Sequence, residues 1–103
     1  MKIRECLSFD DVLLVPKFST LRSRKDANLW TKFTEEYSLE IPIIASPMDT
    51  VTGLDMAYAM FGHGGLGVIH RYNSIEDQAA IVAALSDAEV APIAAAIGAT
   101  DDC

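Results

Sequence analysis

The sequence predicts an α/β fold in which parallel strands alternate with helices. Uniformly apolar runs alternate with segments whose apolar residues recur at helical spacing, and turn residues separate the two kinds of segment. This alternation is typical of a parallel sheet covered by helices, because strands of that kind are buried on both faces. The expected order is β-α-β-α-β, with strands at 41–45, 66–69 and 92–97 and helices at 54–61 and 75–85.

The chain is short for the closed architectures that contain this pattern. A doubly wound sheet and a (β/α)₈ barrel both fit the alternation of strands and helices. The barrel typically needs about 250 residues, whereas the sequence has 103. No G-x-G-x-x-G motif follows the first strand, which weakens the dinucleotide-binding form of the doubly wound sheet. The chain is therefore expected to form part of a larger architecture.

Residues 1–40 differ from the regular part that follows them. They are irregular and interrupted by polar residues, and a loosely alternating stretch at 27–34 suggests a short strand. We expect residues 1–40 to form an arm that packs against the body formed by residues 41–103.

The residues that flank the two helical segments predict where each helix begins and ends. Thr52 and Asp55 have the spacing of a capping box, and Gly62 suits the left-handed residue that ends a helix. Ser74 precedes the second helix, whose first turn contains acidic residues where the helix dipole favours anions. Thr52 is therefore expected to cap the first helix and Ser74 the second.

The composition argues against several classes of function. Half of the residues are hydrophobic, so the chain can bury a core, and the net charge of −7 argues against nucleic-acid binding, which needs clustered Lys and Arg. No apolar stretch approaches the roughly 20 residues of a membrane span, and no signal-peptide pattern opens the sequence. Cys6 and Cys103 lie near opposite ends without a metal-binding or disulfide spacing. We expect a reduced, cytoplasmic protein with no membrane or metal partner.

Polar residues follow each of the three predicted strands. In parallel α/β folds, ligands bind at the carboxyl ends of the strands, so these residues are expected to share one edge of the sheet. The clusters are Ser46-Pro47-Met48-Asp49-Thr50, His70-Arg71-Tyr72-Asn73 and Gly98-Ala99-Thr100-Asp101. Their position indicates a candidate binding site, although spacing alone does not indicate a reaction.

Structural roles fit the same residues. Ser46 and Asp49 could cap the following helix, as an isolated S-x-x-D pair often does. Met48 could fill the core. Arg71 could form an ion pair with Asp49 across the edge of the sheet. On the residues alone, these alternatives stay open.

Five collinear segments carry recognisable motifs. They are 8–16 (SFDDVLLVP), 19–24 (STLRSR), 42–52 (PIIASPMDTVT), 64–71 (GGLGVIHR) and 95–98 (AAIG). Together they resemble the inosine-monophosphate dehydrogenase and guanosine-monophosphate reductase family over nearly the whole chain. Ser46-Pro47 favours the dehydrogenase branch, because the reductases usually carry Asn-Met-Asp in that motif and lack the Gly-Gly-x-Gly-x-Ile-His run.

The resemblance implies a fold, a reaction and ligands. The fold is the N-terminal portion of a (β/α)₈ TIM barrel, in a family whose members typically form homotetramers, so a homo-oligomer is expected. The implied reaction is the NAD-dependent oxidation of inosine monophosphate (IMP) to xanthosine monophosphate. A cysteine attacks C2 of the purine, hydride leaves to NAD, and the covalent adduct is hydrolysed, which divides one difficult step into two easier ones. IMP and NAD are therefore the expected ligands.

The resemblance also implies roles for individual residues. Ser46 and Met48 match positions that touch the nucleotide, where Ser46 would bond the ribose-phosphate portion and Met48 would pack on the purine. Arg71 and Thr100 match positions near the NAD adenosine. Asp49 is expected to support the edge of the sheet.

Two departures from the family pattern limit these implications. Dehydrogenases usually insert a pair of cystathionine-β-synthase-type modules between the second helix and the third strand, and residues 86–91 are too short to contain them. The family's catalytic cysteine lies far downstream on a glycine- and serine-rich loop, and neither Cys6 nor Cys103 lies in such a motif. The phosphate loops, the monovalent-cation site and the water-activating flap are also missing.

We therefore assign no catalytic residue and expect the chain alone to be inactive. The alternatives are a GMP reductase-like enzyme and a non-catalytic partial barrel that self-associates. The exposed strand edges of a partial barrel would favour self-association.

Overall fold

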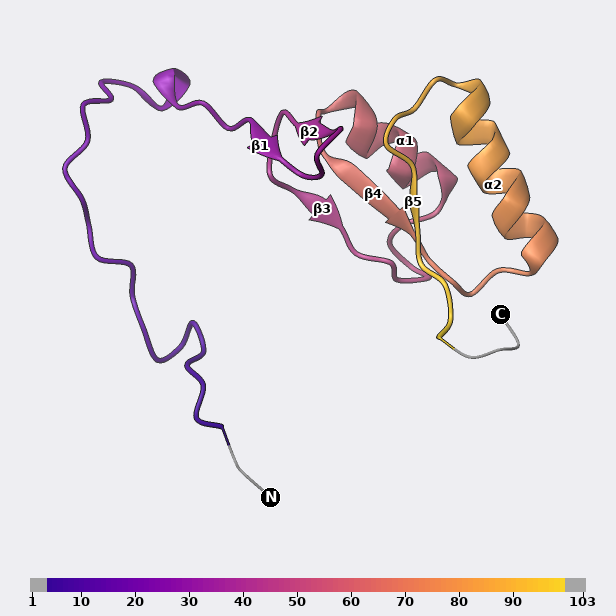
Figure 1. Cartoon of the computed structure of the whole chain (residues 1–103), viewed down its shortest axis with the longest axis horizontal. Coiled ribbons are helices and arrows are strands. Elements are labelled where there is room, and N and C mark those ends of the chain that lie inside the picture. The colour runs from indigo at the N-terminus through magenta and orange to yellow at the C-terminus, as the bar shows by residue number, and fades with distance from the viewer. Residues whose placement is uncertain (1–3, 100–103) are drawn as a thin grey trace.

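The computed structural model describes residues 4–99 and shows an extended N-terminal segment joined to a packed α/β body (Figure 1). In chain order the elements are η1 (Arg24–Asp26), β1 (Thr31–Lys32), β2 (Ser38–Leu39), β3 (Ile44–Ala45), α1 (Leu54–Gly62), β4 (Leu66–Ile69), α2 (Ile75–Asp87) and β5 (Ala94–Ala95). Over these residues, no helix is both long enough and apolar enough to cross a membrane.

The body is built on a parallel sheet with the strand order β3-β4-β5. Ile44 pairs with Leu66, and Val68 pairs with Ala94, so β4 is the central strand. This confirms the predicted β-α-β-α-β order, while the closed barrel stays a prediction. The outer strands are shorter than predicted: pairing begins only beyond Pro42 and Pro92, which have no amide hydrogen to donate to a ladder.

The core lies where both helices meet the central strand. Ile69 of β4 is fully buried, and it packs with Leu85 of α2, Ala57 of α1 and Val90. The helix α1 approaches β4 so closely at Gly67 that an added Cβ would lie only 2.6 Å from the Cα of Ala57. A glycine at this position therefore allows α1 to lie directly on the strand.

The beginning of α1 differs from the prediction, whereas the beginning of α2 agrees with it. The residue at the N-cap of α1 is Gly53, and no side chain caps this helix. Thr52 is buried and donates its hydroxyl to the carbonyl of Ser46 instead (Oγ1···O 2.6 Å), because a buried hydroxyl needs a local partner. Ser74 caps α2 as predicted and accepts a hydrogen bond from the amide of Asp77 (3.1 Å).

The prediction for the end of α1 was wrong by two residues. Gly62 is still helical, and the residue with a left-handed conformation is Gly64, with φ +79°. The carbonyl of Gly64 accepts hydrogen bonds from the amides of Glu40 and Ile41, at 2.9 and 3.1 Å. The turn after α1 therefore also attaches the start of the body to the sheet.

The N-terminal segment has little regular structure. Every residue from 4 to 30 is exposed, and the segment extends away from the sheet in Figure 1. The strand expected at 27–34 is limited to β1, which pairs antiparallel with β2, a strand that was not predicted. We call residues 4–30 the arm. Packing of this region against a barrel stays a prediction.

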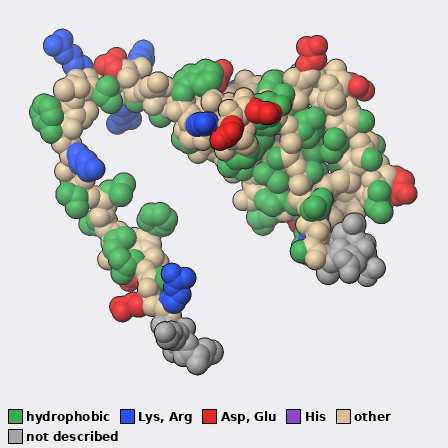
Figure 2. Space-filling view, in the orientation of Figure 1, with side chains coloured by type: hydrophobic (Ala, Val, Ile, Leu, Met, Phe, Trp, Pro, Cys, Tyr) green, Lys and Arg blue, Asp and Glu red, His purple; other side chains and the backbone are tan. Residues whose placement is uncertain are grey.

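Charge is distributed unevenly between the two parts of the chain. Residues 1–32 contain seven of the eight Lys and Arg residues and four of the fifteen Asp and Glu residues. Residues 33–103 contain one Lys or Arg, Arg71, and eleven acidic residues. Figure 2 shows the basic side chains spread along the arm and acidic ones around the body. Residues 1–32 therefore carry a net charge of +3, and residues 33–103 carry a net charge of −10.

Candidate functional site

The carboxyl ends of the three parallel strands meet at one edge of the sheet. We call this edge the rim, and it comprises residues 46–52 after β3, 70–74 after β4 and 96–99 after β5. The predicted polar clusters are therefore brought to the same edge as far as residue 99. Thr100, a predicted cofactor-binding residue, lies outside the described residues.

The loop after β3 presents its predicted binding residues to solvent. Ser46 and Asp49 are exposed, and 53% of the Met48 side chain is exposed, so Met48 does not fill the core. Because no side chain caps α1, Ser46 and Asp49 do not cap that helix either. Both structural alternatives for these residues are therefore wrong.

Backbone hydrogen bonds fold this loop into a tight turn. The amide of Met48 donates to the carbonyl of Ser46 (2.8 Å), and the carbonyl of Met48 accepts from the amides of Val51 and Thr52 (2.9 and 3.0 Å). The backbone, and not side-chain packing, therefore sets the direction of the Ser46 and Met48 side chains.

The loop after β4 contains a group of stacked side chains. The rings of His70 and Tyr72 stack with centroids 6.3 Å apart, and the amide of Tyr72 donates to Nδ1 of His70 (3.2 Å). The guanidinium carbon of Arg71 lies 5.5 Å from the centroid of the Tyr72 ring, within the range of a cation–π interaction. Arg71 is thus held at the rim by an aromatic neighbour.

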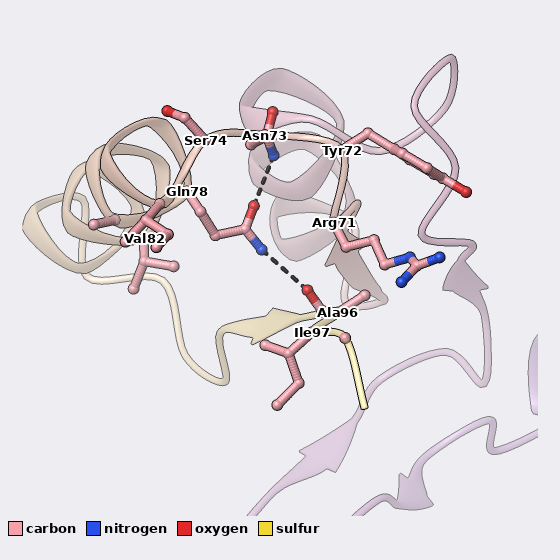
Figure 3. Close-up of a pocket in the computed structure, with 11 residues that line it drawn as sticks. Arg71, Tyr72, Asn73, Ser74, Gln78, Val82, Ala96 and Ile97 are labelled. Carbon is pink, nitrogen blue, oxygen red and sulfur yellow. Dashed lines mark hydrogen bonds between the residues drawn. The ribbon is translucent and has the colours of Figure 1, made fainter. Parts of the chain in front are cut away.

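A cavity of about 600 Å³ lies between this loop, the start of α2 and the end of β5 (Figure 3). Its walls are largely apolar, with Ile75, Val82 and Ile97 among them, and Arg71 lines it on the β4 side. Such a cavity suits a flat, mostly apolar group attached to something charged. Ser46, Met48 and Asp49 do not line it, so the described residues form two adjoining regions of the rim.

Two side-chain amides that line the cavity, those of Asn73 and Gln78, are linked by hydrogen bonds. Asn73 Nδ2 donates to the carbonyl of His70 (2.9 Å) and to Oε1 of Gln78 (2.7 Å). Gln78 Nε2 donates in turn to the carbonyl of Ala96 (3.2 Å), as Figure 3 shows. These bonds connect the loop after β4 to the end of β5 through α2.

Sequence reasoning missed Gln78 and the buried role of Thr52. For Gln78 a signal was present, because it is a polar residue at the spacing of Val82 and Leu85, on the side of α2 that faces the sheet. For metal binding the rim offers no ligand set: within residues 4–99, no three His, Cys, Asp or Glu side chains gather closely enough to hold an ion.

The fold and the site together define a class of protein. The chain is a unit of parallel β/α structure with polar loops at the carboxyl ends of its strands, the edge at which barrel and doubly wound enzymes bind their ligands. The family model described as "IMP dehydrogenase / GMP reductase domain" matches residues 6–102. The chain therefore belongs to this family of oxidoreductases of purine nucleotide metabolism.

Relatives with both activities are similar to the chain. It is 48% identical over 79 residues to an inosine-5'-monophosphate dehydrogenase from Nitrosopumilus maritimus, a match that covers 77% of the chain and 17% of that protein. It is 49% identical over 78 residues to a GMP reductase from Leishmania donovani, a match that covers 76% of the chain and 16% of that reductase. The chain thus spans about a sixth of the length of the curated relatives it matches.

Solved structures share the observed fold. The structure of GMP reductase C318A from Trypanosoma brucei matches the chain with a TM-score of 0.76 and 44% sequence identity. The match covers 84% of the chain and 20% of the reductase chain. The structure of GMP reductase from Trypanosoma brucei in complex with guanosine 5'-triphosphate matches with a TM-score of 0.72 and 46% sequence identity. This match covers 78% of the chain and 19% of the reductase chain. The β-α-β-α-β unit is therefore similar to the corresponding part of an enzyme of this family.

Proposed function

We propose that the chain forms the first part of the nucleotide-binding rim of an enzyme that oxidises IMP to xanthosine monophosphate with NAD. The observation that carries this proposal is the exposed loop after β3, in which Ser46 and Met48 face solvent at the carboxyl end of a parallel strand. The Ser46 and Met48 side chains are free to bind a ligand, since neither caps a helix nor packs in the core.

Each rim segment has a proposed task. The hydroxyl of Ser46 bonds the ribose-phosphate portion of IMP, and the thioether of Met48 packs on the purine ring. Asp49 supports the same loop. A nucleotide bound here lies over the end of β4, next to the loop that holds Arg71.

The cavity at the β4 and β5 ends fits the adenosine portion of NAD. Its apolar walls suit a purine ring, and the guanidinium of Arg71 at its margin suits the negatively charged pyrophosphate. Thr100, which lies outside the described residues, is proposed to bind the same adenosine portion. NAD would supply the hydride acceptor, while the residues of this chain would hold and orient it.

The chain by itself is proposed not to turn over. The covalent mechanism needs a nucleophilic cysteine at C2 of the purine. Cys6 is an exposed residue of the arm, and neither it nor Cys103 belongs to a glycine- and serine-rich motif. The absence of NADH formation from IMP and NAD by the purified chain is the expected result, and turnover lost on mutating either cysteine would refute it.

A reductase is the alternative within the family. The similar identities to an IMP dehydrogenase and to GMP reductases keep it open, whereas Ser46-Pro47 favours the dehydrogenase. Comparing the affinities of the chain for IMP with NAD and for GMP with NADPH distinguishes the two branches.

A second candidate function is self-association of a partial barrel. The outer edges of β3 and β5 have no strand partner within residues 4–99, and apolar side chains of the arm are exposed. Unpaired edges and exposed apolar surface favour assembly with another copy. Sedimentation of the purified chain tests this, and a monomer at all concentrations would contradict it.

We propose the cytoplasm as the location of the protein, where the exposed thiol of Cys6 stays reduced.

The main proposal is tested by calorimetry with IMP. We expect Ser46→Ala to weaken binding by about 0.5–1.5 kcal/mol through the loss of one hydrogen bond. Ser86→Ala is the matched control, because Ser86 is an exposed serine near the far end of α2. If the chain binds IMP and Ser46→Ala binds it equally well, the proposed role of Ser46 is wrong.

A further inference from the structure

Thr52 connects two segments of the rim from a fully buried position. Its side chain has 0% exposure, and its hydroxyl donates to the carbonyl of Ser46 (Oγ1···O 2.6 Å). Its own carbonyl accepts a hydrogen bond from the amide of His70 (3.1 Å) at the end of β4. One residue therefore bonds the start of the loop after β3 and also the start of the loop after β4.

The hydroxyl bond of Thr52 acts on the peptide group that orients Ser46. The carbonyl of Ser46 accepts both this hydroxyl and the amide of Met48 (2.8 Å), so both of its lone pairs are used inside the protein. Without the hydroxyl, a partly buried carbonyl would lose a partner, which costs more than the bond itself contributes. The loop would then keep only its backbone hydrogen bonds, and Ser46 and Met48 would be held less firmly in their present directions.

The methyl group of Thr52 has a separate task. It lies against Gly67 of β4, where an added Cβ would approach the Cγ2 atom of Thr52 to 3.2 Å. The site therefore requires a methyl group for packing and a hydroxyl group for the carbonyl of Ser46. Valine supplies only the methyl group and serine only the hydroxyl, so two small substitutions separate the two tasks.

We propose that Thr52 is a positioning residue that holds the loop of Ser46 and Met48 in the geometry that binds a purine nucleotide. The ligand class rests on the proposed function, whereas the restraint on the loop rests on the hydrogen bonds of Thr52 alone. Thr52 touches no ligand in this scheme, since its side chain is buried beneath the loop.

The experiment compares Thr52→Val with Thr52→Ser in the complete 103-residue chain. Amide hydrogen exchange followed by NMR reports on the loop through the amides of Val51 and His70, which bond Met48 and Thr52. Amides around Leu85, a core residue in the last turn of α2, report on global stability. Titration with IMP gives the affinity of each variant.

We expect Thr52→Val to speed exchange at Val51 and His70 by about tenfold relative to the amides around Leu85. We expect the same variant to weaken IMP binding by about tenfold and Thr52→Ser to restore wild-type loop exchange and affinity, despite the lost methyl group. Equal exchange rates in the two variants, or a uniform change across the whole body, would overturn the proposal. Loosened loop amides with unchanged IMP affinity would overturn the positioning role while the proposed function stands.

Two further results keep the outcomes separate. If the wild-type chain shows no response to IMP, the proposed function fails, and loop exchange still decides whether Thr52 restrains the loop. If Thr52→Val does not fold, the exchange rate of the Thr52 hydroxyl proton in the wild-type chain decides whether Thr52 restrains the loop. A hydroxyl proton in a buried hydrogen bond exchanges slowly with water. A slowly exchanging Thr52 hydroxyl proton supports the restraint, and a rapidly exchanging one refutes it.

Discussion

The arm and the body use similar apolar residues with opposite results. On the arm, Phe9, Leu13 and Phe18 are each 94% exposed, whereas in the body Ile69 and Leu85 are almost completely buried. The arm extends away from the sheet and contributes no residue to the core, while the parallel sheet brings together body residues that are far apart in sequence. Apolar composition therefore creates a core only where strands and helices alternate, and the free energy of folding is concentrated in the body.

The largest expected effect compares a leucine from each region. Leu85→Ala should lower the free energy of unfolding by about 2–5 kcal/mol, because it leaves a cavity in the core beside Ile69. Leu13→Ala is the matched control on the arm and should change it by less than about 0.5 kcal/mol. Urea unfolding followed by circular dichroism measures both. A comparable loss for Leu13→Ala would show that the arm packs against another surface.

The second prediction tests how tightly the body is packed at α1 and β4. Gly67→Ala should destabilise the fold by about 1–3 kcal/mol, because its Cβ would meet the backbone of Ala57. At Gly62 nothing lies within 4 Å of an added Cβ, so Gly62→Ala should be neutral or stabilising by up to about 1 kcal/mol. Thermal unfolding of the two alanine variants gives the comparison, and equal midpoints would argue against the close approach of α1.

Features that depend on local periodicity could be predicted from the sequence, and these include both helices, the parallel strand order and the cap at Ser74. The role of Thr52 could not, since its spacing fits a helix cap and its actual partner depends on the path of the loop. Gln78 likewise bonds a carbonyl 18 residues later, at Ala96, through a tertiary contact. The candidate residues Ser46, Met48 and Arg71 were located at the rim because strand ends could be predicted, while their binding roles stay a proposal.

The third prediction compares two side-chain amides. Gln78→Met should lower the free energy of unfolding by about 1 kcal/mol, because the carbonyl of Ala96 and the side-chain amide of Asn73 each lose a partly buried hydrogen-bond partner. On the arm, Asn28 accepts a hydrogen bond from the amide of Trp30 (3.0 Å) in an exposed turn. Asn28→Ala should therefore change the unfolding free energy by less than about 0.5 kcal/mol. The denaturant midpoints of the two variants measure this difference. Equal shifts of the two midpoints from the wild-type value would contradict the prediction.

The smallest effect concerns ionisation on the arm. The backbone amide of Ser8 and then its hydroxyl donate to the carboxylate of Asp11, at 3.1 and 2.9 Å, and these bonds hold the pKa of Asp11 below its usual value. Because the pKa of Asp11 is lower in the folded state, its ionisation stabilises the turn at 8–11 at any pH above the unfolded-state pKa. This stabilisation is lost as the pH falls through the folded-state pKa.

Ser8→Ala should therefore raise the pKa of Asp11 only part of the way to its usual value, since the larger contribution, from the backbone amide, remains. The carboxyl ¹³C shift of Asp11 against pH measures this change. Ser19→Ala, in the same arm, is the control and should leave the titration of Asp11 unaltered. A titration of Asp11 that Ser8→Ala does not move would show that the hydroxyl contributes nothing.

The separation of a basic N-terminal segment, residues 1–32, from the acidic remainder makes the molecule an electric dipole, which its net charge of −7 conceals. An anion exchanger would retain the molecule by the acidic body. Two copies in dilute buffer would repel each other through their net charge, and this repulsion would fade once the Debye length falls to about 8 Å near physiological salt. Ionic strength therefore controls how closely the basic segment of one molecule can approach the acidic body of another.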